Sequence, residues 1–341
     1  MKAINFFVGI DVSKETLDFC LVVQGKYFSS FTSKNTVEGI KNSVEKLIKE
    51  QKIIAQETVF CLEHTGIYSY HLCAVLQELG LSIWLENPTQ IKFSMGLQRG
   101  KNDKIDARRI AQYAYKNREN VKEWTPKREN IVLLTELLAV RDRLSTTLHA
   151  LAVPIKEQKK YWNEKLYEEI SPYSQTVVEE LEKQIKAVNA KIDEIMDKDE
   201  HLKELFGLIT SVPGIGRITA TELIVQTNEF KDFSSARKLA CYVGVAPFEH
   251  SSGSSVRGRT KVSQKANKKI KTLLQLVTMN CAKVRGKMNV FKAYYQRKVA
   301  EGKSKMSVLN ALKNKILHTI FAVVKNGQKF ENKLENCLVK P

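Results

Sequence analysis

Four acidic side chains in the first third of the chain are candidates for metal-dependent chemistry. Asp11 ends an apolar, strand-like segment, and Glu63 ends a second one. Asp103 and Asp106 lie three residues apart at the start of a predicted helix, so both can face the same direction. An ionised carboxylate among apolar residues is costly unless it is paired or binds a metal. Four acids placed in this way can hold two divalent ions, which stabilise the attacking and leaving oxygens at a phosphodiester.

Each acid also has a structural explanation. Asp11 could start a turn, Asp103 could cap the helix that follows it, and Glu63 could pair with His64 or with a lysine. The four acids together, in strand–strand–helix order and joined to a basic second half, favour metal-dependent nuclease chemistry.

Positive charge is concentrated in the last third of the chain. The whole chain carries 55 Lys and Arg against 37 Asp and Glu, and residues 231–341 hold 24 of the basic residues but 5 of the acidic ones. No Asp or Glu occurs between His250 and Ala300, where 13 Lys or Arg lie. Such a segment is typical of a protein that neutralises the phosphates of a polyanion. The alternatives are a solvated surface or a tail attracted to anionic lipid, but the apolar helical pattern of this half favours nucleic acid.

The elements that must position the acids are predicted to form an α/β domain. Alternating strand and helix signals run through residues 5–120, and three strands come first. The predicted strands are 5–11, 17–24, 26–32, 58–62 and 81–85, and the predicted helices are 37–51 (capped by Asn35), 67–79 and 103–115. Three leading strands followed by βα units fit a mixed sheet.

The second half is predicted to be mostly helical. Apolar residues recur at heptad spacing from Val178 to Ile195 and at similar steps over 134–151, which indicates two long helices. They could form an antiparallel coiled coil, an oligomerisation arm or part of an ordinary bundle, and Pro154 and Pro172 are predicted to bracket their connection. Residues 212–216 (Val-Pro-Gly-Ile-Gly) could be a helix-hairpin-helix turn or a plain loop between helices.

Motifs from both halves resemble one known family. They are Gly-Ile-Asp-Val-Ser-Lys at 9–14, Glu-His-Thr-Gly-Ile-Tyr at 63–68, Asn-Pro at 87–88, Lys-Asn-Asp-Lys-Ile-Asp-Ala at 101–107, the 212–216 turn, Leu-Ala-Cys-Tyr-Val-Gly-Val-Ala-Pro at 239–247 and Ser-Ser-Gly at 251–253. In this order, over nearly the whole chain, they resemble the DEDD transposases of the insertion-sequence family one-ten (IS110/IS1111 type). That family includes the Piv-type DNA invertases.

The resemblance implies a fold class and a domain plan. The fold would be an α/β RuvC-like (RNase H-like) N-terminal domain, followed by a mostly α-helical coiled coil and a C-terminal transposase domain. On this sequence we expect the RuvC-like domain at 1–125, the coiled-coil region at 126–206, the transposase domain with its serine loop and basic helices at 207–330, and a flexible tail at 331–341.

The resemblance also implies a site and its partners. Asp11, Glu63, Asp103 and Asp106 would bind Mg²⁺ (or Mn²⁺), and Ser252 would form a covalent 5′-phosphoserine link to DNA. Ser251 stands beside it, so the nucleophile is ambiguous by one residue. A structured non-coding bridge RNA would pair with target and donor DNA, and the two sites would be assembled from different subunits of a homo-oligomer, a dimer or tetramer.

Three departures from the family pattern leave the catalytic groups in place. His64 stands where a small residue is more frequent, and Asn102 replaces a threonine before the third acid. Ala266-Asn267 stands where Gly-Asn often follows the serine loop, which makes the backbone geometry of that loop less certain. From the residues alone, 251–255 (Ser-Ser-Gly-Ser-Ser) predict only a flexible loop.

Lysines and arginines near these motifs are the candidate phosphate contacts. Those beside the serines could stabilise charge on a phosphate, and the later lysines are predicted to lie on a helix that starts near Ser263. The set is Lys101, Lys104, Arg257, Arg259, Lys261, Lys265, Lys268, Lys269 and Lys271.

Other features limit where the chain works. No apolar run approaches the roughly 18 residues that span a bilayer, and no signal-peptide pattern is present. Six cysteines without metal-site or disulfide-scaffold spacing favour a reducing cytoplasm, and the family resemblance implies a nucleoid-associated protein of a bacterial or archaeal cell. The leading hypothesis is therefore an RNA-guided, serine-dependent DNA recombinase. A RuvC-like nuclease or DNA invertase without a guide RNA, and a non-catalytic nucleic-acid-binding protein, are the alternatives.

Overall fold

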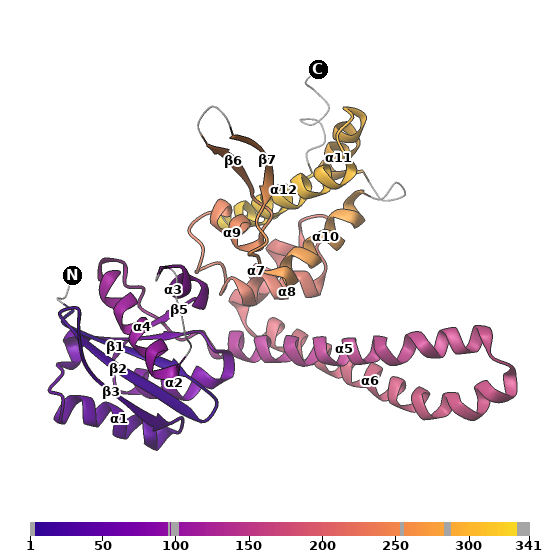
Figure 1. Cartoon of the computed structure of the whole chain (residues 1–341). Coiled ribbons are helices and arrows are strands. Elements are labelled where there is room, and N and C mark those ends of the chain that lie inside the picture. Colours follow the sequence, from indigo (N-terminus) through magenta and orange to yellow (C-terminus); the bar gives the residue numbers. More distant parts are fainter. Residues whose placement is uncertain (1–3, 95, 97–101, 253–255, 283–287, 333–341) are drawn as a thin grey trace. The chain divides into compact units, whose positions relative to one another are not determined.

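The structure, a computed structural model, describes residues 4–94, 96, 102–252, 256–282 and 288–332. The chain divides into two compact units, Met1–Pro126 and Lys127–Pro341 (Figure 1). Of the predicted tail at 331–341, residues 333–341 lie outside the described part.

The first unit is built on one five-stranded sheet. Its strands are β1 (Phe6–Val12), β2 (Thr16–Val23), β3 (Lys26–Lys34), β4 (Thr58–Glu63) and β5 (Ser82–Glu86). Their order is β3-β2-β1-β4-β5. β2 runs antiparallel to its neighbours β1 and β3, and β4 and β5 run parallel to β1. This mixed sheet is the RNase H-like arrangement, so the predicted fold class of the N-terminal half is confirmed.

Helices cover both faces of this sheet. They are α1 (Val37–Lys49), η1 (Ala55–Glu57), η2 (Gly66–Ser69), α2 (Tyr70–Glu78), α3 (Pro88–Ser94), α4 (Asp103–Lys116) and η3 (Arg118–Asn120). One apolar core joins the sheet to α1 and α2, and a second joins the opposite face to α3 and α4. The predicted Asn35 cap of α1 is wrong: the Thr36 side chain accepts from the Gly39 amide, and Asn35 instead donates to the Ser13 and Tyr68 carbonyls.

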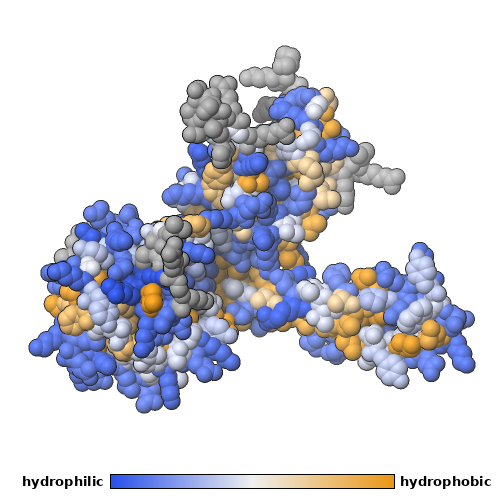
Figure 2. Space-filling view, in the orientation of Figure 1, coloured by the Kyte–Doolittle hydropathy of each residue, from blue (hydrophilic) through white to orange (hydrophobic). Residues whose placement is uncertain are grey.

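The second unit begins with a long helical hairpin, here called the arm. It consists of α5 (Glu129–Tyr161) and α6 (Glu164–Lys198), which pack against each other. The prediction that Pro154 and Pro172 bracket the connection is wrong, because both lie inside the helices and Trp162 and Asn163 alone join them. Asn163 caps α6 through the Leu166 amide, which allows so short a turn. Orange, hydrophobic patches remain visible along the arm (Figure 2).

The remainder of this unit packs around one core. Its helices are α7 (Glu200–Thr210), α8 (Arg217–Gln226), α9 (Ala236–Val243), α10 (Lys268–Ala282), α11 (Val290–Ala300) and α12 (Lys305–Asn326). A hairpin of β6 (Pro247–Ser252) and β7 (Val256–Val262) lies between α9 and α10 in sequence. The core takes residues from the base of the arm and from α7 to α12, so this half is mostly helical, as predicted.

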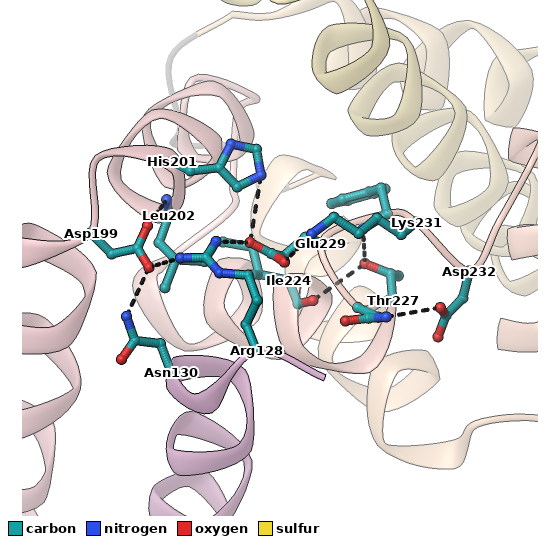
Figure 3. Close-up of polar contacts among 12 residues, drawn as sticks. Arg128, Asn130, Asp199, His201, Leu202, Ile224, Thr227, Glu229, Lys231 and Asp232 are labelled. Atoms are coloured by element: carbon teal, nitrogen blue, oxygen red, sulfur yellow. Dashed lines mark hydrogen bonds and ion pairs between the residues drawn. The ribbon is translucent and has the colours of Figure 1, made fainter. Parts of the chain in front are cut away.

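A buried polar cluster fixes the base of the arm to α7 and α8 (Figure 3). The Arg128 guanidinium, just before α5, contacts the carboxylates of Asp199 and Glu229. Glu229 is fully buried and also lies within 3.5 Å of His201 and 2.6 Å of Lys231. Its φ of +57° belongs to a left-handed run over residues 228–230, which the surrounding contacts must hold in place. No helix among the described residues is both long and apolar enough to cross a membrane.

Candidate active site

Two of the predicted acids lie at the carboxyl ends of neighbouring parallel strands. Asp11 is next to last in β1, and Glu63 is last in β4. The strand register pairs Ile10 with Leu62, so the two acids follow directly on adjacent strands. Since side chains alternate along a strand, both carboxylates belong to the sheet face that α4 covers.

A close backbone contact brings α4 onto that face. A Cβ atom on Gly9 would overlap the backbone of Ala107 and Ala111, so only glycine permits this approach. Gly9 lies two residues before Asp11, and Asp106 directly precedes Ala107. The first turn of α4, which carries Asp103 and Asp106, is thereby held near the carboxyl end of β1. Its cap is Asn102, whose side chain accepts from the Lys104 amide, so Asp103 is the first helical residue and not the cap.

The four acids are close enough to influence one another's charge. The pKa of Asp11 is raised from 3.8 to about 6, mainly by burial and then by repulsion from Asp103, Asp106, Glu63 and Asp18, in that order. Burial, followed by Asp106, also raises the pKa of Glu63. Carboxylates that repel each other in a partly buried place favour either a proton or a cation between them.

The donor set suits a hard divalent cation, because all four groups are carboxylates. Among the described residues, however, no three His, Cys, Asp or Glu side chains are already grouped as a metal site. Asp106 accepts from Arg109 at 2.5 Å, one turn further along α4. The acids therefore converge on one end of the sheet without forming a closed coordination shell.

Two further acids lie on the same sheet face and were missed from the sequence. Asp18 on β2 pairs with Asp11 in register and accepts from the Thr32 hydroxyl at 2.6 Å. Glu86 ends β5 beside Glu63; it accepts from the Tyr113 hydroxyl at 3.0 Å and from the Asn87 amide at 2.8 Å. Side chains alternate between the two faces of a strand, and this alternation was the signal that could have found them. It places one acid on this face of each of the four neighbouring strands β2, β1, β4 and β5. Because both oxygens of Glu86 are engaged, it positions α4 against the sheet.

The candidate serines lie on a strand of the second unit, not in a loop. Ser251 and Ser252 end β6, and their partners in β7 are Arg257 and Val256. The prediction of a flexible loop over 251–255 is thus wrong for the two serines, while 253–255 fall outside the described residues. The side chains of Ser252, Arg257 and Arg259 are also outside the described part; Lys261, on β7, is exposed.

The predicted phosphate contacts divide into three groups. Lys104 and Lys268 are exposed at the starts of α4 and α10, and Lys271 is half-buried. Lys101 lies outside the described residues. The predicted helix start near Ser263 is wrong, since α10 begins at Lys268 and Lys265 precedes it with its amide bonded to the Ser263 hydroxyl.

Lys269 needs a correction, because its charge is used inside the protein. Its ammonium pairs with the fully buried Glu222 of α8 and, at 2.5 Å, with Asp142 of α5. Burial raises the pKa of Glu222, opposed by Lys269, so the lysine is needed where it is. Lys269 therefore ties α5, α8 and α10 together and does not present a free charge to a phosphate.

The Pro-Gly turn between α7 and α8 has a packing explanation. Gly214 has φ of +83°, and a Cβ there would meet the Cys281 sulfur at 2.5 Å. The Cys281 thiol donates to the Pro213 carbonyl at 3.2 Å. Contact with α10 thus accounts for this glycine without a bound phosphate.

Comparison with known proteins agrees with both halves of this description. One family model, described as a transposase and named for the DEDD transposases of IS110, matches residues 8–158. A second, described as the transposase IS116/IS110/IS902 family, matches residues 207–296. An RNase H-like unit with converging acids, joined to a helical transposase unit, defines a DNA transposase or recombinase. The chain belongs to the IS110 family of transposases.

Relatives cover nearly the whole chain. The pilin gene-inverting protein of Moraxella bovis is 26% identical over 331 residues, 96% of this chain and 98% of its own length. The transposase for insertion sequence element IS1533 of Leptospira borgpetersenii is 24% identical and covers 68% of this chain and 72% of its own length. Among solved structures, Thermus thermophilus RuvC in complex with a Holliday junction substrate covers 35% of this chain and 99% of its own, at 15% identity and a TM-score of 0.28.

Proposed function

We propose that this transposase cuts and rejoins DNA with a divalent-metal site made of Asp11, Glu63, Asp103 and Asp106, and with Ser252 as nucleophile. A structured bridge RNA pairs with target and donor DNA, and the chain works at the nucleoid, in the cytoplasm, as a dimer or tetramer. Residues 1–125 act as the catalytic domain, 126–206 as the coiled coil and 207–330 as the transposase domain.

One observation carries the metal site. The Gly9 contact with α4 holds the turn of Asp103 and Asp106 against the strand end that bears Asp11, with Glu63 next to it. Acidic side chains on a β-strand, a neighbouring strand and a helix start are thereby brought to one place from three distant parts of the sequence. Burial, and after it repulsion from the neighbouring acids, raises the pKa of Asp11, as expected where such carboxylates converge before a cation binds.

The proposed reaction proceeds in two transfers. When bound, Mg²⁺ or Mn²⁺ would stabilise charge on the phosphodiester oxygens. The Ser252 oxygen attacks phosphorus and loses its proton; the bond from phosphorus to the 3′ oxygen breaks, and that oxygen gains a proton. In the second transfer a 3′ hydroxyl attacks the phosphoserine, loses its proton, and returns a hydroxyl to the serine. Because one phosphoester bond replaces another, no external energy source is required.

DNA inversion is a second candidate outcome of the same chemistry. The relative named as a pilin gene-inverting protein matches 96% of this chain, which favours inversion over simple insertion. It requires the same acids and serine, and the guide RNA is then dispensable. Adding or omitting RNA transcribed from the sequence flanking the gene separates RNA-guided recombination from inversion without a guide RNA.

Denaturing gels of the full chain with labelled DNA and a divalent ion test the proposal. A protein–DNA adduct that survives denaturation is expected, and Ser252→Ala should abolish it while Ser251→Ala, the matched neighbour, leaves it. Asp11→Asn should lower cleavage by more than about 100-fold, beyond what a lost supporting residue costs at a metal site. Cleavage without an adduct would refute the serine step and favour a nuclease; no cleavage with any divalent ion would favour a non-catalytic nucleic-acid-binding protein.

A further inference from the structure

A buried lysine in the second unit has no internal counter-charge. Lys313 on α12 is 7% exposed, and within the described residues no ion pair or hydrogen bond joins its ammonium to another side chain. Lys271 of α10 lies near enough to disfavour its charge. Burying a cation beside a second cation is costly unless an anion compensates both.

The helices around Lys313 supply it with no paired carboxylate among the described residues. α9, α10 and α11, which pack on α12, contain no Asp or Glu, and neither does α12 itself. α7, which also packs on α12, carries Glu200 and Glu204, and neither is joined to Lys313 by an ion pair within the described part of the chain. The nearby buried Glu222 is already paired with Lys269. Two lysines in the first turn of α10, on different faces of the helix, thus differ sharply: Lys269 has two acidic partners inside the fold, and Lys271 lies beside Lys313 instead.

The lysine pair lies near the base of the serine hairpin. Asn310, one turn before Lys313, donates to the Val245 carbonyl at 3.3 Å, two residues before β6 begins. On the other side, α10 starts with Lys268 soon after β7 ends. An anion held between α10 and α12 would therefore lie close to where the hairpin leaves the helical core.

We infer that Lys271 and Lys313 form a subsite for one backbone phosphate of the nucleic acid, at the base of the β6–β7 hairpin. The missing counter-charge, the burial of one lysine and the position beside the hairpin all fit a single tetrahedral oxyanion. The subsite holds the strand; it reads no sequence, since phosphate contacts are shared by all sequences. This inference rests on the proposed nucleic-acid function; it joins Lys313, which the motifs did not indicate, to the predicted phosphate contact Lys271.

Salt titrations of oligonucleotide binding test the subsite. In the full chain, Lys313→Met should weaken binding several-fold and lower the slope of log affinity against log salt by roughly 0.7 to 0.9, the value for one phosphate contact. If Lys313→Met fails to fold, Lys271→Ala, at a half-buried position, supplies the same test and should lower the slope by the same amount. The control is Lys198→Met, which removes one charge from a lysine already paired with Glu194 and should leave the slope unchanged.

Thermal unfolding supplies the second measurement. Without nucleic acid, Lys313→Met should raise the midpoint, because it replaces an uncompensated buried charge with an apolar group of similar volume. An unchanged salt slope in both lysine variants, with wild-type binding intact, would overturn the subsite and leave the proposed function standing. If inorganic phosphate stabilises the wild-type chain while the salt slope of both variants is unchanged, the two lysines bind a free anion. That result would equally overturn the nucleic-acid subsite. A wild-type chain that binds no oligonucleotide would refute both.

Discussion

At the scale of single residues, Asp11 is the group whose protonation matters most. Its pKa of about 6 in the folded chain exceeds the unfolded 3.8, so the native state retains a proton that the unfolded state has lost between these values. The stability cost of ionising Asp11 is therefore absent below about pH 3.8 and complete above about pH 6. Asp11→Asn should raise the thermal midpoint of the metal-free chain at pH 7.5, and the gain should vanish as the pH falls toward 4.

Divalent ions should reverse this effect, because they bind the ionised carboxylate. Adding Mn²⁺ at pH 7.5 is expected to stabilise the wild-type chain and not Asp11→Asn, and the stabilisation should weaken as the pH falls through 6. Calorimetric scans across this range measure both trends, with the exposed Glu123→Gln as the charge-matched control. Equal stabilisation of wild type and Asp11→Asn by Mn²⁺ would show that Asp11 is no ligand.

Arg128 offers a test of the buried polar cluster at the base of the arm. Arg128→Met removes the guanidinium that bridges Asp199 and Glu229, and it leaves Lys231 and His201 to compensate a fully buried carboxylate. Because Lys231 still pairs with Glu229 and Arg128 is itself partly exposed, the loss should be smaller than for a fully buried pair, and urea denaturation should show about 1–3 kcal/mol. The surface pair offers a comparison: Lys49→Met, which loses contact with Glu45, should cost less than about 0.5 kcal/mol.

At the scale of elements, the approach of α4 to β1 is the feature on which the metal site depends. Gly9→Ala inserts a methyl group into the backbone of Ala107 and Ala111, so α4 must move outward. We expect a stability loss of about 1–3 kcal/mol and a larger loss of DNA cleavage, because Asp103 and Asp106 move with the helix. Gly207→Ala, in α7 with open space around it, is the matched control and should stabilise the chain by about 0.5–1 kcal/mol. If Gly9→Ala cleaves DNA as fast as the wild type, the position of α4 does not control cleavage and this prediction is contradicted.

Element by element, periodicity predicted more than local chemistry did. Periodicity predicted the strands that bear Asp11 and Glu63 and the helix that bears Asp103. It succeeded because the apolar pattern of each element depends on burial alone. The caps and the ends of the arm were mispredicted, since Asn35 and Asn102 compete with equally good neighbours and a long packed hairpin tolerates Pro154 and Pro172. The role of Lys269 was hidden because its partner Glu222 is 47 residues away in a helix that reads as plain core. Convergence of the four acids could be proposed from the sequence, but the Gly9 contact that produces it could not.

At the scale of the whole molecule, the apolar cores and the excess positive charge both follow the division of the chain into two units. The apolar clusters of the first unit are separate from that of the second. The excess positive charge lies in residues 231–341, within the second unit, whereas the first 230 residues carry 31 basic and 32 acidic residues. We therefore expect affinity for nucleic acid and affinity for divalent ions to reside in different units.

Separate expression of residues 1–126 and 127–341 tests this division. Each fragment keeps its own core and should unfold cooperatively. The first fragment should bind Mn²⁺ by calorimetry and bind oligonucleotides weakly; the second should bind oligonucleotides with a steep salt dependence that is unaffected by chelators. Neither fragment alone should form the DNA adduct, because the first carries the acids without the serine and the second carries the serine without the acids, and mixing them should restore little unless the units associate. Metal-dependent DNA binding by the second fragment alone would contradict the division, since the only acids proposed as ligands lie in the first.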